Sequence, residues 1–120
     1  MIQGQKLNLI AGDTYDLNTN NLLSWTDDGT FPTLTGANIL FTIGTGTNAG
    51  VQVIFSQTCS LLIGPPQIIT ASLSSEQTGQ LTSGISYIYE VRAQMENEDL
   101  TTLVSGGQTF VTIPITNFGE

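Results

Sequence analysis

The clearest pattern in the chain is a strict alternation of apolar and polar positions over residues 85–95. The odd positions are apolar or aromatic, and the even positions are polar apart from Ile88: the odd set is Ile85, Tyr87, Tyr89, Val91, Ala93 and Met95. A period of two predicts a β-strand with one buried face and one face in water. Only Ile88 departs from this pattern.

Shorter segments with strand-like composition fill most of the remaining chain. They cover residues 5–10, 15–17, 22–26, 37–43, 51–55, 61–63, 67–73, 100–104 and 109–115. Asp27-Asp28-Gly29 and residues 96–99 are typical of turns, and the glycine-rich residues 44–50 are expected to form a hairpin loop. Residues 74–81 predict a single helical turn capped by Ser74 or Ser75.

These elements predict an all-β protein, an immunoglobulin-like antiparallel β-sandwich of seven to nine strands. Leu81 and Gly84 precede Tyr87 at a spacing typical of the corner in such sandwiches, where a tyrosine hydroxyl bonds back to the preceding backbone. The alternative is that Tyr87 and Tyr89 simply line the core. With 120 residues, the chain fits one domain, assigned to residues 1–115, followed by a tail over residues 116–120.

Charge is scarce and strongly acidic. The chain has ten acidic side chains and only two basic ones, Lys6 and Arg92, which gives a formal net charge of -8. Such a chain repels phosphate, so we expect no nucleic-acid partner and no anionic membrane partner. It also contains no signal peptide and no apolar run of about 20 residues, so we expect a soluble protein made in a reducing cytoplasm.

Catalytic chemistry is disfavoured by composition. There is no histidine, so neither a Ser-His nor a Cys-His nucleophile pair can form. Cys59 is the only cysteine and has no basic neighbour in sequence, so it is expected to be an incidental thiol. We therefore predict no enzyme activity, no catalytic residues and no cofactor.

Acidic residues gather at two turns, residues 27–28 and residues 96–99. Their carboxylates are candidate calcium ligands, since calcium prefers hard oxygen donors. The loops lack the alternating ligand spacing of a dedicated calcium loop, however, so we favour solvated turns and predict no metal site.

The aromatic residues leave two interpretations open. Trp25, Phe31 and Tyr15 could form an exposed platform for a carbohydrate, but Trp25 is more typical of a core plug. Phe31 and Phe118 are better candidates for exposed contacts with a protein. Pro114 indicates that residues 109–115 form an edge strand that could pair with a neighbour. The candidate partner contacts are therefore Phe31, Thr109, Val111, Ile113, Ile115 and Phe118.

Several short segments occur together in an order found in a known family, and they span nearly the whole chain. They are Gly12-Asp13-Thr14-Tyr15, Asp28-Gly29-Thr30-Phe31-Pro32, Leu34-Thr35-Gly36-Ala37-Asn38-Ile39, Leu73-Ser74-Ser75-Glu76-Gln77-Thr78, Gly84 through Tyr87-Ile88-Tyr89-Glu90-Val91, and Leu103-Val104-Ser105-Gly106 before Phe110-Val111. In this ordered set the chain resembles the immunoglobulin-like domain of tailed-bacteriophage virion proteins, such as the N-terminal domain of siphophage baseplate upper proteins and related head or tail accessory proteins.

The resemblance implies a non-catalytic structural protein of the virion, made in the host cytoplasm, whose partners are other virion proteins. A small accessory subunit that decorates or cements the capsid, bound to the major capsid protein, is favoured, because the family often continues into a fibre and this sequence stops at Glu120. A neck, tail or baseplate component and a carbohydrate-binding or adhesin module are the alternatives. A homo-oligomer remains open. Residues 51–64 are longer and more apolar than the family pattern.

Overall fold

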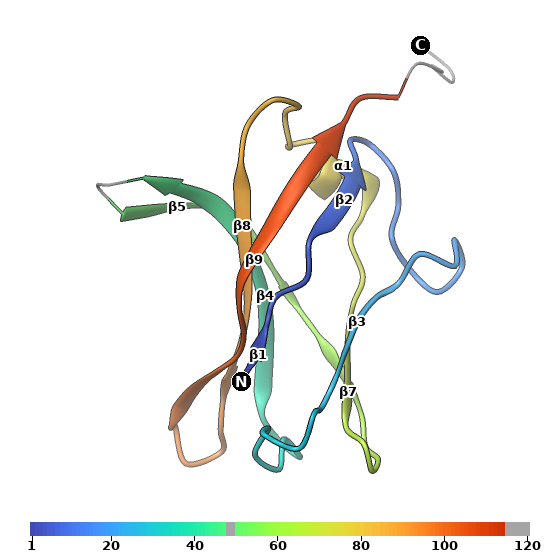
Figure 1. The fold of residues 1–120 in the computed structure, drawn as a ribbon. Coiled ribbons are helices and arrows are strands. Elements are labelled where there is room, and N and C mark those ends of the chain that lie inside the picture. Colours follow the sequence, from blue (N-terminus) through green and yellow to red (C-terminus); the bar gives the residue numbers. More distant parts are fainter. Residues whose placement is uncertain (48–49, 115–120) are drawn as a thin grey trace.

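The computed structural model describes residues 1–47 and 50–114, which form a β-sandwich with one short helix (Figure 1). The strands in this part of the chain are β1 (Ile2–Gln3), β2 (Leu7–Ile10), β3 (Leu23–Thr26), β4 (Asn38–Thr47), β5 (Gly50–Thr58), β6 (Ser60–Leu62), β7 (Ile68–Ala71), β8 (Tyr87–Gln94) and β9 (Leu100–Thr112), and the helix is α1 (Ser75–Thr78). The predicted all-β class is confirmed.

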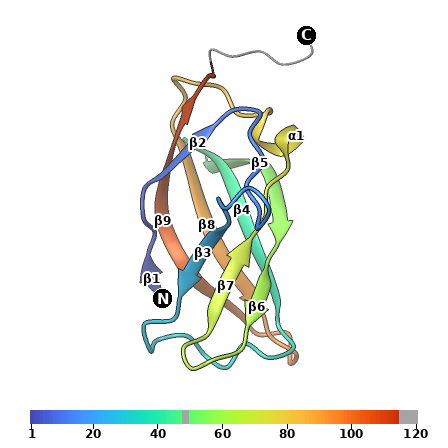
Figure 2. The same ribbon diagram turned by 90° about the vertical axis from the view of Figure 1, so that its right-hand side faces the viewer.

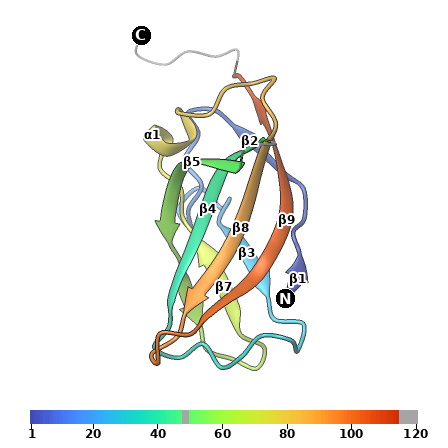
Figure 3. The same ribbon diagram turned by 90° about the vertical axis from the view of Figure 1, so that its left-hand side faces the viewer.

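Two sheets face each other across the core. The large sheet has the order β1-β9-β8-β4-β5, with β2 also paired to β9, and the small sheet has the order β3-β7-β6. Figure 2 shows the small sheet in front, and Figure 3 shows the outer face of the large sheet. This strand order is that of an immunoglobulin-type sandwich. The expected purely antiparallel pairing is wrong at one edge, because β1 and β2 run parallel to β9.

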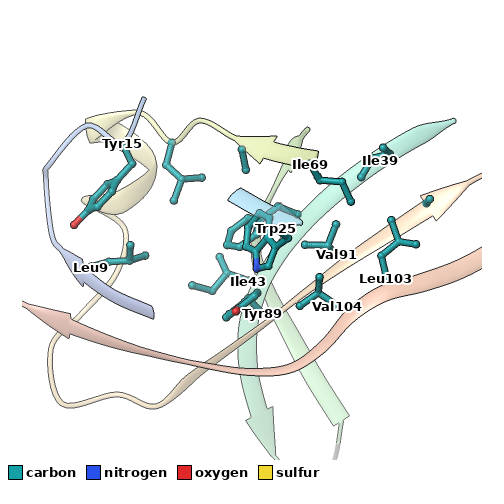
Figure 4. Close-up of a cluster of buried hydrophobic side chains, with 14 of the residues drawn as sticks. Leu9, Tyr15, Trp25, Ile39, Ile43, Ile69, Tyr89, Val91, Leu103 and Val104 are labelled. Atoms are coloured by element: carbon teal, nitrogen blue, oxygen red, sulfur yellow. The ribbon is translucent and has the colours of Figure 1, made fainter. Parts of the chain in front are cut away.

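The strand predicted over residues 85–95 forms the middle of the large sheet as β8. Its odd positions from Tyr87 to Ala93 are buried and its even positions face outward, as the alternation predicted. Trp25 of β3 reaches across from the small sheet, with its ring centroid 5.7 Å from that of Phe41 and 5.8 Å from that of Tyr89 (Figure 4). Offset aromatic contacts of this kind stabilise the core beyond the apolar area that they bury. The prediction that Trp25 is a core plug is confirmed.

All three tyrosine hydroxyls are tied to backbone groups. Thr82 N donates to the Tyr87 hydroxyl at 2.9 Å, which confirms the predicted corner. Ile10 N donates to the Tyr15 hydroxyl at 2.8 Å, and the Tyr89 hydroxyl donates to the carbonyl of Gln5 at 2.5 Å. The core therefore holds the N-terminal segment by two side-chain bonds as well as by its pairing with β9.

The predicted helical turn is confirmed as α1. Ser74 is its N-cap and accepts from Gln77 N at 3.1 Å, while the Gln77 side chain accepts from Ser74 N at 2.8 Å. This reciprocal capping box satisfies backbone donors that a helix of four residues cannot satisfy itself.

Two predictions about loops and edges are wrong. Residues 44–47 continue β4, so the predicted hairpin loop over residues 44–50 is much shorter, and its tip at residues 48–49 lies outside the described residues. β9 is not an edge strand, because its residues 109–112 pair in parallel with β2, and Thr109 also pairs with Tyr87 of β8 on the other side. The predicted tail, residues 116–120, also lies outside the described residues.

A β-bulge explains a further difference in β5. Ile43 faces Phe55 but Gly44 faces Val53, so Ile54 is an extra residue in the strand. The extra residue reverses the orientation of the side chains before it. A regular strand would place Val53 on the same inner face as Phe55, but with the extra residue Val53 is 58% exposed.

Candidate docking surface

The predicted contact residue Phe31 lies in the core and is only 8% exposed. The turn before it folds the loop inward, because one carboxylate oxygen of Asp27 accepts from Gly29 N at 2.7 Å and from Phe31 N at 3.1 Å. The expectation of an exposed aromatic at this loop tip is wrong, and Phe31 offers no surface to a partner.

The predicted contacts on β9 divide between the two faces of the sheet. Thr109 and Val111 point into the core, so their side chains are buried. Phe110, between them, points outward and is 45% exposed. Ile113 is exposed just after the end of β9, whereas Ile115 and Phe118 lie outside the described residues. The large exposed side chain is thus Phe110 and not the predicted contacts Thr109 and Val111, because successive residues of a strand alternate between its two faces.

The outer face of the large sheet carries a row of exposed apolar side chains. We call it the outer apolar row; it consists of Ile10 on β2, Phe110 on β9, Ile88 on β8 and Val53 on β5. Strand register places these residues near one another across the sheet, since Ile88 pairs with Gln108 and with Gly44, and Gly44 pairs with Val53.

Glycine at position 44 leaves a hollow in this row. The hollow has a volume of about 250 Å³ and is lined by Thr42, Gly44, Val53, Ile88, Tyr89, Glu90 and Gly106. A second hollow of about 210 Å³ shares Thr42 and Glu90 and continues down the same face past Arg92 to Leu100. Together they make the outer face uneven, a shape that can receive protruding side chains of another protein.

The charges of this face differ from those of the rest of the chain. Both basic side chains are here: Arg92 borders the second hollow, and the ammonium of Lys6 lies 4.4 Å from the ring centroid of Phe110. Within the described strands of the large sheet, Glu90 is the only acidic residue. A face that combines apolar side chains with the only basic side chains of an acidic chain is a candidate protein-docking surface.

The structure disfavours a carbohydrate platform. Trp25, Tyr15 and Phe31, the three aromatic residues considered for it, are all buried. An exposed planar set of rings therefore cannot be built from these residues.

The acidic turns have structural roles. The pKa of Asp27 is lowered chiefly by the hydrogen bond from Phe31 N, and the pKa of Asp28 is lowered chiefly by the hydroxyl of Thr30. Asp28 accepts from Thr30 Oγ1 at 2.5 Å and from Thr30 N at 3.1 Å. Among residues 1–47 and 50–114, no group of three or more acidic, cysteine or histidine side chains converges to hold a metal ion.

Cys59 is poorly suited to act as a nucleophile. Burial raises the pKa of its thiol from 9.0 to about 12, and the thiol donates to the carbonyl of Gln57 at 3.8 Å. The thiolate is the reactive form, so a raised pKa makes this residue unreactive near neutral pH.

No protein-family model matches the chain, and no curated protein shows significant similarity to it. In the part of the chain that the structure describes, no helix has the length and apolar character needed to span a bilayer.

The sequence contains one signal for the outer apolar row. Ile88 is the only even position of the alternating strand that is not polar, and it lies at the centre of the row. The position of Lys6 could not be predicted, because it depends on the parallel pairing of β2 with β9, about 100 residues apart in sequence.

Proposed function

We propose that the protein is a non-catalytic structural component of a bacteriophage virion, a small accessory subunit that decorates or cements the capsid. It docks on another virion protein through the outer face of the large sheet. The observation that carries the docking surface is the gathering of the outer apolar row, Lys6 and Arg92 on one face of a chain with a net charge of -8.

The resemblance in the sequence supports the assignment to virions. It implies an immunoglobulin-like sandwich, and both the strand order and the hydrogen bond from Thr82 N to the Tyr87 hydroxyl agree with that fold. The unreactive thiol of Cys59 and the absence of histidine support a structural role over a catalytic one. A position in the neck, tail or baseplate would use the same docking surface against a different subunit.

The first experiment determines whether the protein is in the particle. Virions produced from the genome that encodes the chain are purified on a density gradient and analysed by mass spectrometry, with heads and tails separated. We expect the chain in the head fraction at many copies per particle. Its presence only in tails would move it to the neck, tail or baseplate, and its absence from both fractions would overturn the proposal.

The second experiment tests the surface. Particles assembled without the chain are titrated with purified wild-type protein and with a double variant, Ile88→Thr and Phe110→Thr, whose fold is checked by circular dichroism. Loss of two apolar anchors should weaken binding by about tenfold or more. Leu17→Thr is the matched control, because Leu17 is 76% exposed in the loop between β2 and β3 and lines neither hollow of the outer face. Equal binding by the double variant and the control would exclude this surface.

A further inference from the structure

The chain contains no charged side chain between Asp28 and Glu76. Four strands, β4 to β7, fall in this span. Of these, β4 and β7 are interior strands, whereas β5 is the outermost strand of the large sheet and β6 is the outermost strand of the small sheet. The two outermost strands, β5 and β6, are joined by Cys59 and lie along one side of the molecule (Figure 2). We call residues 50–62 the charge-free edge.

The charge-free edge presents backbone groups that no further described strand pairs with; one of them, the Thr58 carbonyl, accepts from the side chain of Gln57 at 3.2 Å. Cys59 N donates to the carbonyl of Ile39 at 2.8 Å, and Gln57 faces Phe41 two residues further along each strand. Hydrogen-bonded pairs recur every second residue in an antiparallel ladder. The N–H and C=O groups of Ser56 and Thr58 consequently point away from β4, toward the open side of the sheet, where another strand could bond to them.

The other edges carry charges close to the strand. Lys6 directly precedes β2, and Asp27 and Asp28 directly follow β3. Charged side chains on edge strands oppose pairing with another chain. The charge-free edge has only the bulge at Ile54 as an irregularity, and this leaves residues 55–58 as a regular segment. Asp16 and α1, which carries Glu76, lie beside Gln57, but the strand itself carries no charge, so its own side chains oppose pairing with another strand least.

We infer that the charge-free edge pairs with the same edge of a second copy of this chain. Two copies with a net charge of -8 each repel one another, and this repulsion is weakest where the facing strands carry no charge. An antiparallel pair of identical strands is self-complementary, as a twofold interface requires. With the axis at Ser56, each Ser56 exchanges both backbone bonds with its counterpart, and Thr58 faces Ile54 of the other copy.

Apolar side chains flank the pairing segment on both sides. Val53 is 58% exposed before it, and Leu62 is 61% exposed after it. Bringing a second copy to this edge reduces the exposure of these side chains to water, which favours association. The pairing goes beyond the proposed function, because it needs no other virion protein.

The test is the oligomeric state of the isolated chain, measured by analytical ultracentrifugation up to about 1 mM protein, the range that detects weak dimers. Ser56→Lys and Ser56→Asp each place two like charges at the twofold axis, so both should weaken dimerisation by about tenfold or more, whichever sign is introduced. Ser24→Lys and Ser24→Asp are the matched controls, since Ser24 is an exposed serine on β3, the opposite edge of the small sheet. They should dimerise like the wild type.

Hydrogen exchange of the wild type provides a readout that needs no substitution. We expect the amides of Ser56 and Thr58 to become more protected as protein concentration rises. Added salt should strengthen the dimer, because it screens the repulsion between two acidic chains and breaks no ion pair at this edge. A monomer at all concentrations, open-ended assemblies, or a dimer that the Ser56 variants leave unchanged would overturn the proposal. Any of these results would leave the test for presence in virions unaffected.

Discussion

At the scale of single residues, two buried threonines have opposite surroundings. The hydroxyl of Thr78 accepts from Gly12 N at 3.1 Å and donates to the carbonyl of Asp13 at 2.7 Å. The hydroxyl of Thr109 is also buried but has no hydrogen-bond partner among the described residues. A buried hydroxyl without a partner loses its bonds to water and gains nothing in exchange.

This contrast predicts opposite effects of the same substitution. Thr109→Val should stabilise the fold by about 1 kcal/mol, because it replaces an unpaired hydroxyl with a methyl group of similar size. Thr78→Val should destabilise it by about 1–3 kcal/mol, because Gly12 N and the Asp13 carbonyl lose their partner. Urea unfolding of both variants measures these changes. A loss of stability in Thr109→Val comparable to that of Thr78→Val would show that Thr109 is satisfied after all.

Cys59 predicts a specific dependence of stability on alkaline pH. Folding raises the pKa of its thiol from 9.0 to about 12, so the folded state holds this proton more tightly than the unfolded state. The resulting contribution to the free energy of unfolding is complete below pH 9 and is lost as pH rises from 9 to about 12. Cys59→Ala should make the decline in urea midpoint over this range shallower.

Tyr89 contributes to the same alkaline decline. Burial raises the pKa of its phenol above 10.0, so its contribution to stability is lost from pH 10 upward, and part of the decline should persist in Cys59→Ala. If Cys59→Ala had the same pH profile of stability as the wild type, the alkaline decline could not be assigned to Cys59.

At the scale of elements, the sequence predicted the strands whose side-chain pattern is local. The alternation in β8 and the cap of α1 at Ser74 are as expected. The edges were not predictable in this way. The status of β9 depends on β2, a partner from the other end of the chain, and the orientation of Val53 depends on an extra residue at Ile54.

The same limit applies to the candidate docking surface. Pattern alone indicated that residues 109–115 contact a partner. Thr109 pairs with both β8 and β2, and Val111 pairs with β2, and the side chains of both residues are buried in the core. Phe31 was expected to be exposed because it follows a turn, and the hydrogen bonds to Asp27 fold it inward. Long-range pairing and side-chain bonds to the backbone, which short sequence motifs do not encode, decide both cases.

Two glycines of the large sheet, one on β9 and one on β4, give opposite predictions. Gly107 lies directly under the ring of Tyr89, so a Cβ at position 107 would clash with the ring atoms. The ring cannot move aside, because Tyr89 is buried and its hydroxyl is bonded to the carbonyl of Gln5. Gly107→Ala should therefore destabilise the fold by about 1–3 kcal/mol through overpacking.

Gly46 on β4 is the matched control. Among the described side chains, a Cβ at this position meets the terminal methyl carbon of Ile88 alone, at 3.4 Å, so Gly46→Ala should change stability by less than about 0.5 kcal/mol. Thermal unfolding of both variants gives the comparison. Equal effects of the two substitutions would show that β9 can shift away from Tyr89.

At the scale of the whole molecule, charge is distributed unevenly over the sandwich. Acidic side chains lie mainly at turns and ends, both basic side chains lie on the outer face of the large sheet, and residues 29–75 carry no charge. The excess of negative charge opposes the compact state and opposes contact between copies. It leaves the outer face and the charge-free edge as the two surfaces where another protein can approach with the least repulsion.

This distribution predicts that salt stabilises the isolated protein at neutral pH. Raising NaCl to about 0.5 M should increase the urea midpoint at pH 7, because salt screens the repulsion among ten acidic side chains. The effect should disappear near pH 4.1, where the net charge approaches zero. Below about pH 3.8 stability should fall, since the lowered pKa values of Asp27 and Asp28 mean that protonation disrupts their turns.

The double variant Glu96→Gln and Glu98→Gln separates screening from other effects of salt. Both carboxylates are exposed in the turn before β9, so their removal reduces the net charge from -8 to -6 without disturbing the core. The variant should be more stable than the wild type at low salt and should respond less to NaCl. If salt stabilised both proteins equally, general salting-out would be the cause. If salt destabilised the wild type, attractive ion pairs would outweigh the repulsion. The electrostatic argument for pairing of two copies at the charge-free edge would then fail.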